Sequence, residues 1–522
     1  MLLATAEFIV PAHPRRVTLT WSAIVLLLVA VIPSLQFAGG LIVFSGDAWM
    51  TSIYLLGLTL AYVLGVQLGS SSSRAQATDI LSTLFLIAAV ISSFLGLMQW
   101  LGIQGLNFWL MEIRPGGRPY ANITQPNNFA TLLCLGLAGL LYLRAKGYLG
   151  NGVSGLIALV LFSGIALSQS RASVLILFVI TAWIFWKRKR VPLRLATSQI
   201  LLGLGLSIGF WLAYPIVSDA LNLSDSSLVG AELIEHRMSN DGRLVMWTQL
   251  IEAALHKPMV GYGWNQVSMA QITVAAEYPH AEAVQQSHNF ILDLLVSNGL
   301  LLGGALTLLI GWWIISRTRS CTDLESWFAL LVIGAVTTHA LVEFPHEYAY
   351  FLLPLGLCAG LVDATHHISR LTISRRWLQA TVAIGWLALG VTSLDYLRLE
   401  EDFRRLRFES IGIEARRPPE VTTSPIVLSQ LSEFIRFART EARPDMTEDQ
   451  LAWMERVAHR YPHMPSLFRY ALALGLNGYY DEASLELQRL ARLHPPVYLD
   501  DFRANWAAAV AHYPTLANVT PP

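Results

Sequence analysis

The chain has 522 residues, of which 54% are hydrophobic and 14% charged, and its mean hydropathy is +0.48. Soluble globular proteins carry about 25% charged residues, so this composition excludes an ordinary soluble domain and predicts a polytopic membrane protein. Lys plus Arg and Asp plus Glu number 36 each, and this balance gives no indication of nucleic-acid binding. The three cysteines form no C-x-x-C pair, so neither a disulfide framework nor a zinc site is indicated.

Eleven apolar runs have the length of membrane-spanning helices, which need ~20 residues each. They centre on residues 19–38, 50–68, 78–100, 127–144, 151–168, 172–187, 196–216, 289–316, 325–343, 347–364 and 377–396. Alternate connections are basic, with cations at Arg15, Arg16, Arg74, Arg144, Lys146, 187–190, Arg194, Arg317, Arg319, Arg370, Arg375 and Arg376. The positive-inside rule places these connections and the N-terminus in the cytoplasm, and the C-terminal tail outside.

We therefore predict an all-α fold with about eleven transmembrane helices and a large outer loop. The expected parts are helices one to seven (1–216), the large loop (217–288), helices eight to eleven (289–396) and a soluble helical domain (397–522). The last part contains "SLFRYALALGLNGYYDEASLELQRLARLHP", which predicts a two-helix hairpin similar to a single tetratricopeptide repeat.

Arginines occur on the outer side, where the positive-inside rule disfavours them. Arg118 precedes an amide-rich helix start that contains Gln125 and Asn128. Arg171 lies in a tight turn between two apolar helices, and Arg243 begins an amphipathic helix of the large loop. Because guanidinium pairs with phosphate through two hydrogen bonds, these arginines suggest a phosphate or diphosphate ligand. An arginine of this kind, taken alone, is more often one that reaches to the membrane interface, and it is their occurrence together on the outer side that points to a ligand.

The large loop re-enters the membrane at a polar cluster, His288, Asn289 and Asp293. A charged residue in hydrocarbon costs at least ~2.5 kcal/mol, so such groups face a bundle interior or a water-filled cavity. We expect Ser287 to be the N-cap, with Asn289 and Asp293 on one helix face. Near the positive end of a helix dipole, a histidine stays neutral near pH 7 and can accept a proton. The alternative is a histidine that only caps loop backbone.

Two glycines follow on the same predicted helix, Gly299 and Gly303. Small residues four positions apart favour close packing of membrane helices. We therefore expect this helix to pack closely on a neighbouring helix.

Another outward turn carries Glu343, with His339 and His346 nearby. We interpret Glu343 as a carboxylate that orients an arginine. A metal site formed by these three residues is disfavoured because Pro345 breaks the helix between them. Neither a nucleotide-binding motif nor an HExxH motif is present, so we expect no cofactor and no metal.

Five stretches, in this order and spacing, resemble the O-antigen ligase/Wzy-like superfamily, and within it the PglL/PilO-type bacterial protein O-oligosaccharyltransferases. They are "RPYANITQPNNFATLL", "SQSRASVL", "DGRLVMWTQLIEAALHKPMVGYGW", "SHNFILDLLVSNGLLLG" and "EFPHEYAYFLLPLG". The resemblance covers nearly the whole chain. It implies en bloc transfer of a preassembled glycan from undecaprenyl diphosphate to Ser or Thr of a periplasmic protein such as a pilin. It further implies an inner-membrane enzyme with a periplasmic active site and no metal or cofactor.

The resemblance also assigns roles to residues. His288 matches the essential loop histidine, and Arg171 and Arg243 match the arginines that bind the donor diphosphate. We accordingly expect catalysis by His288 and Arg243, donor binding by Arg171, Arg243 and Arg118, and support from Gln125, Asn128, Glu343 and Asn289.

Two alternatives remain open at this point. An O-antigen ligase or a Wzy polymerase would use the same site with a sugar acceptor. In a transporter, Arg171, His288 and Asp293 would form an ion path, but the long outer loop and the absence of visible inverted repeats argue against this class.

Overall fold

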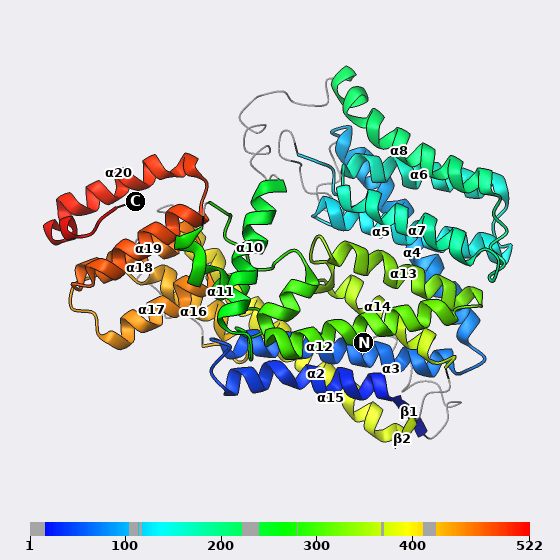
Figure 1. Ribbon diagram of the computed structural model, residues 1–522, viewed down its shortest axis with the longest axis horizontal. Helices are drawn as coiled ribbons and strands as arrows, with labels where there is room; N and C mark the ends of the chain where they lie inside the picture. The colour runs from blue at the N-terminus through cyan, green and yellow to red at the C-terminus, as the bar shows by residue number, and fades with distance from the viewer. Residues whose placement is uncertain are drawn as a thin grey trace.

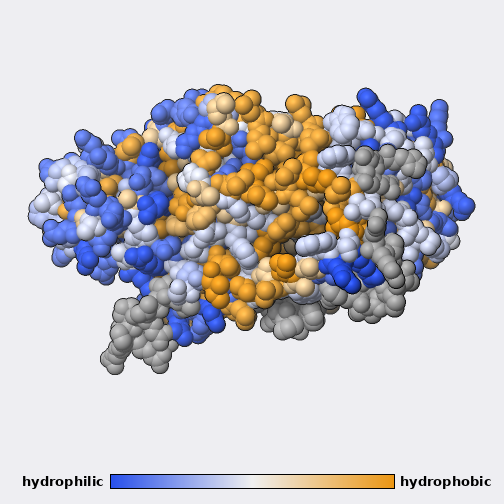
Figure 2. Space-filling view, turned by 90° about the horizontal axis from the view of Figure 1, so that it is seen from below, coloured by the Kyte–Doolittle hydropathy of each residue, from blue (hydrophilic) through white to orange (hydrophobic). Residues whose placement is uncertain are grey.

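The computed structural model describes residues 16–103, 113, 117–221, 240–278, 280–366, 370–410 and 424–521, and most of them are helical (Figure 1). Each of the eleven predicted apolar runs falls on one helix. These helices are α2 (Trp21–Ala38), α3 (Ser45–Gly69), α4 (Arg74–Trp100), α5 (Pro126–Lys146), α6 (Asn151–Ser168), α7 (Arg171–Lys187), α8 (Thr197–Ala220), α12 (Phe290–Ser320), α13 (Leu324–Ala340), α14 (Ala349–Asp363) and α15 (Arg375–Ser410). Apolar side chains gather in a band across the middle of the molecule, with polar side chains at both ends (Figure 2).

Within the described ranges, eight of these helices are long and apolar enough to cross a membrane. Helices α7, α13 and α14 are shorter, with 17, 17 and 15 residues. A helix of 17 residues is about 25 Å long, slightly less than the ~30 Å of bilayer hydrocarbon. The protein is therefore a polytopic, mainly helical membrane protein, and the number of eleven spans stays a prediction.

Small residues allow α3 and α14 to pack backbone to backbone. A Cβ added to Gly65 would lie 2.2 Å from the Leu357 carbonyl oxygen, and one added to Gly360 would lie 2.0 Å from that of Tyr62. Such contacts are typical of membrane helix pairs, whose association depends on close packing. Helix α5 lies among α4, α6, α7 and α13, with most of its side chains buried. Its first residues are therefore placed in the middle of one end of the bundle.

A short antiparallel ribbon departs from the all-α prediction. Strand β1 (Arg16–Thr20) pairs with β2 (Arg370–Ser374), with Arg16 opposite Ser374. The ribbon joins the beginning of α2 to the beginning of α15, although the two strands lie about 350 residues apart in the chain. Sequence patterns missed it because five-residue runs of Val, Leu, Ile and Thr carry a strand signal only when a partner is known.

The C-terminal region forms a helical domain beside the membrane helices (Figure 1). It comprises α16 (Ser429–Arg439), α17 (Glu448–Arg460), α18 (Met464–Leu476), α19 (Tyr480–Leu493), η3 (Pro496–Tyr498), α20 (Leu499–His512) and η4 (Pro514–Asn518). The predicted hairpin is α18 and α19, and its turn contains Gly478 at φ 89°. Helix α15 passes the expected boundary at residue 396, and its extension packs Leu399 and Phe403 against Leu428 and Ile435 of the C-terminal region.

The outer loop contributes α10 (Asn240–His256), α11 (Val267–Val274) and η1 (Ala275–Glu277), and η2 (Pro345–Glu347) follows α13. Residues 1–15, 222–239 and 411–423 of the predicted parts lie outside the described residues.

A buried ion pair joins the C-terminal domain to the membrane part. Arg460, the last residue of α17, donates from Nε and Nη2 to the two carboxylate oxygens of Asp47 in the first turn of α3, at 2.9 Å each. Both side chains are almost fully buried, at 9% and 4% exposure. Arg460 also donates to Gln285, three residues before His288. The domain is therefore tied both to the membrane helices and to the loop that carries the histidine.

We expect Arg460→Met to leave Asp47 as an uncompensated buried charge, at a cost of about 3–5 kcal/mol. The C-terminal domain should then become sensitive to limited proteolysis in detergent, and the thermal midpoint should fall. Arg443→Met, which changes an exposed arginine of the same domain, is the control. An Arg460→Met protein with unchanged proteolysis and midpoint would show that the pair does not hold the domain.

Candidate active site

The N-terminus of α12 is capped by Asn289, whose side-chain oxygen accepts hydrogen bonds from the amides of Ile291 and Leu292 at 3.0 and 3.2 Å. The prediction that Ser287 is the cap is wrong. Its hydroxyl donates to the Asn289 carbonyl at 2.7 Å, and its amide donates to the Asp293 carboxylate at 2.8 Å. Asn289 has extended backbone, as an N-cap requires, and its amide oxygen reaches the first turn directly.

His288 adopts a left-handed backbone conformation, φ 55°, which is uncommon for a residue with a side chain. The conformation is fixed by its neighbours, because Trp247 of α10 donates from Nε1 to the Ser287 carbonyl at 2.8 Å. The imidazole packs edge-on against Phe344, with ring centres 4.8 Å apart. Its Nδ1 lies 2.9 Å from Oε2 of Glu343, so Nε2 is the nitrogen that remains to exchange a proton with a ligand.

Glu343 is the centre of the arrangement. It lies just after α13 and is 6% exposed. Its Oε2 meets His288, while its Oε1 accepts from Nη2 of Arg243 at 2.8 Å and from Nδ2 of Asn127 at 3.1 Å. Burial alone raises the pKa of the Glu343 carboxyl, but the His288 hydrogen bond and the charges of His288 and Arg243 outweigh burial and lower it below its ordinary value. Glu343 is therefore a carboxylate at neutral pH.

Arg243 is held at two points at the beginning of α10. Besides the ion pair with Glu343, its Nη1 donates to the Val342 carbonyl at 3.2 Å. A guanidinium has five N–H donors, so others remain for a ligand. The expected amphipathic pattern is followed only in part, because α10 buries Leu250 and Ala254 but leaves Leu244 and Ile251 more than half exposed.

The amide-rich stretch forms the N-terminus of α5. Gln125 is its N-cap and accepts from the amide of Asn128, and Pro126 occupies the first position of the helix. The buried Asn128 donates to the Tyr350 hydroxyl at 3.1 Å. Asn127, not Asn128, reaches Glu343. Sequence reasoning missed Asn127 because the motif offers two adjacent asparagines, and only the packing of α5 decides which one faces the carboxylate.

Arg118 and Arg171 lie at a second location, the turn between α6 and α7. Arg118 donates from Nη1 to the carbonyl of Gln169, two residues before Arg171. Arg171 is the first residue of α7 and is exposed. Helix α7 packs on α5 and α13, and consecutive helices alternate in direction, so this turn is at the same end of the bundle as Asn127 and Glu343. The structure thus joins Arg243, Glu343 and His288 directly and places Arg118 and Arg171 at the same end.

Helix α12 is interrupted at Gly299, where φ is 73° and ψ 174°. The prediction that Gly299 belongs to a helix-packing pair is therefore wrong. Backbone from the loop after α10 enters the break: the amide of Tyr262 donates to the Val296 carbonyl at 2.8 Å, and that of Leu300 donates to the Pro258 carbonyl at 2.7 Å. Gly303 does permit close packing, but against Leu294 in the first segment of the same helix. These backbone hydrogen bonds fix the position of α10, and therefore of Arg243, relative to His288.

Comparison with known proteins decides the family. The model of a family described as "O-Antigen ligase" matches residues 156–308, and one described as "Virulence factor membrane-bound polymerase, C-terminal" matches residues 327–510. The chain is 32% identical over 492 residues to the General O-oligosaccharyltransferase of Acinetobacter baylyi, in an alignment that covers 92% of this chain and 85% of the relative. The chain belongs to the O-oligosaccharyltransferases.

A second relative supports this assignment. The chain is 28% identical over 456 residues to the ComP-specific O-oligosaccharyltransferase of the same species, covering 85% of this chain and 80% of the relative. The resemblance inferred from the sequence is confirmed, and the protein is a glycosyltransferase of protein O-glycosylation. Residues 156–308, matched by the ligase family, include Arg171, Arg243 and His288.

The Glu343 carboxylate should contribute to stability in a pH-dependent way. A carboxyl whose pKa is lowered by folding stabilises the protein above its ordinary pKa of 4.5 and loses this contribution as the pH falls through the lower folded-state pKa. Glu343→Gln should therefore cost about 1.5–3 kcal/mol at neutral pH, because hydrogen bonds to a charged group are lost. The difference from the wild type should shrink below pH 4.5.

Thermal unfolding in detergent at a series of pH values measures this difference. Glu252→Gln, which changes a carboxylate with 42% exposure on α10, is the matched control and should have little effect. A Glu343→Gln protein as stable as the control at neutral pH would contradict the central role of Glu343.

Proposed function

We propose that this O-oligosaccharyltransferase transfers a preassembled glycan en bloc from undecaprenyl diphosphate to Ser or Thr hydroxyls of periplasmic proteins such as pilins. The observation that carries the proposal is the network in which Glu343 binds His288 and Arg243 on its two oxygens. It combines one group that can accept a proton with one that can neutralise an anion. Glycosyl transfer from a diphosphate to a hydroxyl requires both.

His288 is the proposed general base. As the acceptor oxygen bonds to the anomeric carbon of the glycan, Nε2 of His288 takes the hydroxyl proton, and the bond from that carbon to the diphosphate breaks. Glu343 on Nδ1 holds the ring in place and stabilises the imidazolium that forms, as the carboxylate of a Ser-His-Asp triad does. A positioned base of this kind typically contributes ~10²–10⁴ in rate.

The arginines are the proposed partners of the leaving group. The lipid diphosphate departs with developing negative charge, and fixed guanidinium donors stabilise such charge without the reorganisation that water requires. Arg243 contacts the base network and is the proposed catalytic arginine, while Arg171 and Arg118 at the neighbouring turn would bind the rest of the diphosphate. Gln125, Asn128 and Asn289 support the site as helix caps and as a buried hydrogen-bond donor.

The proposed location is the bacterial inner membrane, with the N-terminus in the cytoplasm and the site and C-terminal domain in the periplasm. Helix α5 supports this orientation, since Asn127 at its start belongs to the site and Arg144 and Lys146 lie in its last turn. The basic end of the bundle is therefore opposite to the site, as the positive-inside rule expects for a periplasmic site.

A sugar acceptor is the second candidate, because the two matching family models are described as ligase and polymerase. The C-terminal domain favours a protein acceptor. A lipid-linked sugar reaches the site by diffusion within the bilayer, whereas a folded protein needs a docking surface outside it. One relative is named a ComP-specific O-oligosaccharyltransferase, which agrees with a dedicated acceptor.

Purified enzyme, supplied with a lipid-diphosphate glycan and a Ser-containing periplasmic protein, should glycosylate that protein in EDTA, as detected by intact-protein mass spectrometry. His288→Ala should reduce the rate by ~10²–10⁴ without loss of membrane abundance, while His366→Ala, at the opposite end of the bundle, should have no effect. Ligation of the glycan to lipid A–core with no protein product would favour the sugar-acceptor alternative. A fully active His288→Ala enzyme would show that the histidine only caps loop backbone and does not act in catalysis.

Arg171→Lys and Arg243→Lys should each retain only part of the activity of the wild type. Lysine preserves the charge but lacks the planar pair of donors that binds phosphate oxygens. The corresponding Ala variants should bind the lipid diphosphate more weakly, and Arg376→Lys at the basic end should behave as the wild type. Unchanged donor binding with a defect only in acceptor use would show that these arginines serve the acceptor instead.

A further inference from the structure

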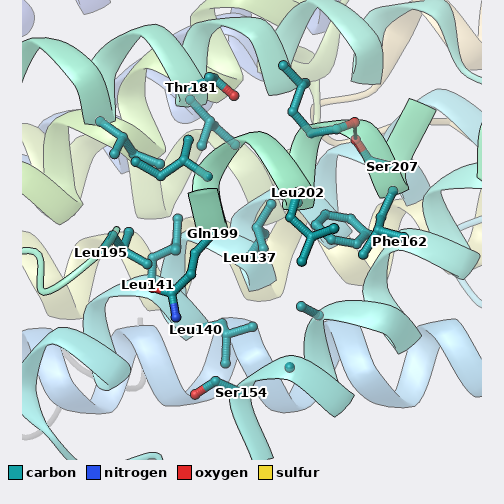
Figure 3. Close-up of a pocket in the computed structure, with 18 of the residues that line it drawn as sticks. Leu137, Leu140, Leu141, Ser154, Phe162, Thr181, Leu195, Gln199, Leu202 and Ser207 are labelled. Atoms are coloured by element: carbon teal, nitrogen blue, oxygen red, sulfur yellow. Dashed lines mark hydrogen bonds between the residues drawn. The ribbon is translucent and has the colours of Figure 1, made fainter. Parts of the chain in front are cut away.

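A cavity of about 390 Å³ lies among α5, α6, α7 and α8, away from the candidate active site. Its walls are mostly apolar and include Leu137, Leu141, Phe162, Ile180 and Leu202. Leu141, Leu195 and Gln199 lie at one end of it, and Phe162 and Ser207 at the other (Figure 3). An engineered apolar cavity of about 150 Å³ already binds benzene and stays free of water. The volume here lies in the range of about 300–1,000 Å³ that is typical of ligand sites.

The cavity is open toward the lipid-facing surface of the bundle. Leu159 and Leu202 border it and are 40% and 62% exposed, and Gly155 leaves open space in its wall, with no atom within 4 Å of an added Cβ. One buried polar atom also belongs to the lining: the hydroxyl of Ser154, a residue with 5% exposure, has no hydrogen-bond partner in the part of the chain that the structure describes. Because the cavity is open toward the lipid-facing surface, a hydrocarbon chain of the bilayer can enter it from the side.

The polar end of the cavity carries the positive charge of Arg144. Arg144 lines it and donates to the Arg194 carbonyl, to Asn151 Oδ1 and to Gln199 Oε1. These acceptors are all neutral. By contrast, Lys146, two residues later, pairs with Glu325 at 2.7 Å. The positive charge of Arg144 is thus held in place by oxygens that do not neutralise it.

The loop that leads into α8 adds further cations. Arg188 donates to the Thr197 hydroxyl at 2.6 Å, and Arg190 donates to the carbonyl of Arg319. Thr197 is the first residue of α8, whose next turn supplies Gln199 and Ile200 to the cavity. An anion bound beside Arg144 would therefore also experience the positive charge of Arg188, which is bound to the first residue of α8.

We propose that this cavity binds an anionic phospholipid, with one acyl chain among α5–α8 and the phosphate beside Arg144. Basic pockets between transmembrane helices are known to hold anionic lipid headgroups.

The donor diphosphate is excluded as the headgroup by position. Arg144 and Asn127 are 17 residues apart on α5, which is about 26 Å along the helix. The lipid fills the gap between α8 and its neighbours, and so supplies packing to a helix that is otherwise mostly exposed.

The test uses the full-length protein purified in mild detergent, with native mass spectrometry of retained lipid. Wild-type protein should retain phosphatidylglycerol in preference to phosphatidylethanolamine, and added phosphatidylglycerol should raise its thermal midpoint. Gly155→Leu fills the cavity and should reduce retention several-fold and abolish the rise. Gly152→Leu, one turn earlier on the same helix and outside the cavity with equally open surroundings, should behave as the wild type.

A second pair of variants keeps the test decisive if Gly155→Leu fails to fold. Gly203→Val adds volume inside the cavity at ordinary contact distance from Phe162, and Gly205→Val adds it outside. Arg144→Gln should keep lipid retention but lose the preference for phosphatidylglycerol. Equal retention by the cavity-filling and control variants, or a wild type without headgroup preference, would overturn the proposal.

Discussion

The buried carboxylate of Glu343 is the constraint on which the site depends. Removing a charge from water is expensive unless hydrogen-bond donors replace the water. Here three donors do so, from Arg243 of α10, Asn127 of α5 and His288 before α12. Because the carboxylate needs all of them, it fixes the relative positions of four chain segments. The groups proposed for proton transfer and for charge neutralisation are therefore set by a single anion.

Two further contacts keep this arrangement in register. The broken helix at Gly299 accepts backbone from residues 258–263, so the loop that carries α10 cannot slide along the helix that begins after His288. On the other side, the amides of Ala281 and Ala283 donate to the carbonyls of Arg492 and Leu493 in the C-terminal domain. The segment before His288 is thus held between the membrane helices and the C-terminal domain.

The two ends of the bundle carry different kinds of charge. At the outer end each charge of the Glu343 network has a partner, which suits a site that must hold its groups in a fixed geometry. At the basic end, Lys146 is paired with Glu325, whereas Arg144 and Arg188 have only neutral partners among the described residues and retain their positive potential. The same helices therefore bring a balanced polar network to one membrane face and a cationic surface to the other.

The sequence by itself determined the helices and the candidate residues, because hydropathy and charge are local properties. Each apolar run became a helix, and His288, Arg243 and Glu343, all chosen for polarity in apolar surroundings, lie in contact. Only the tertiary structure decided their geometry, since the partners of Glu343 lie 55, 100 and 216 residues away in the chain. For the same reason the choice of Asn127 over Asn128, the break at Gly299 and the β1–β2 ribbon were not predictable. Each is a contact between distant segments, and the pattern of either segment alone is compatible with several alternatives.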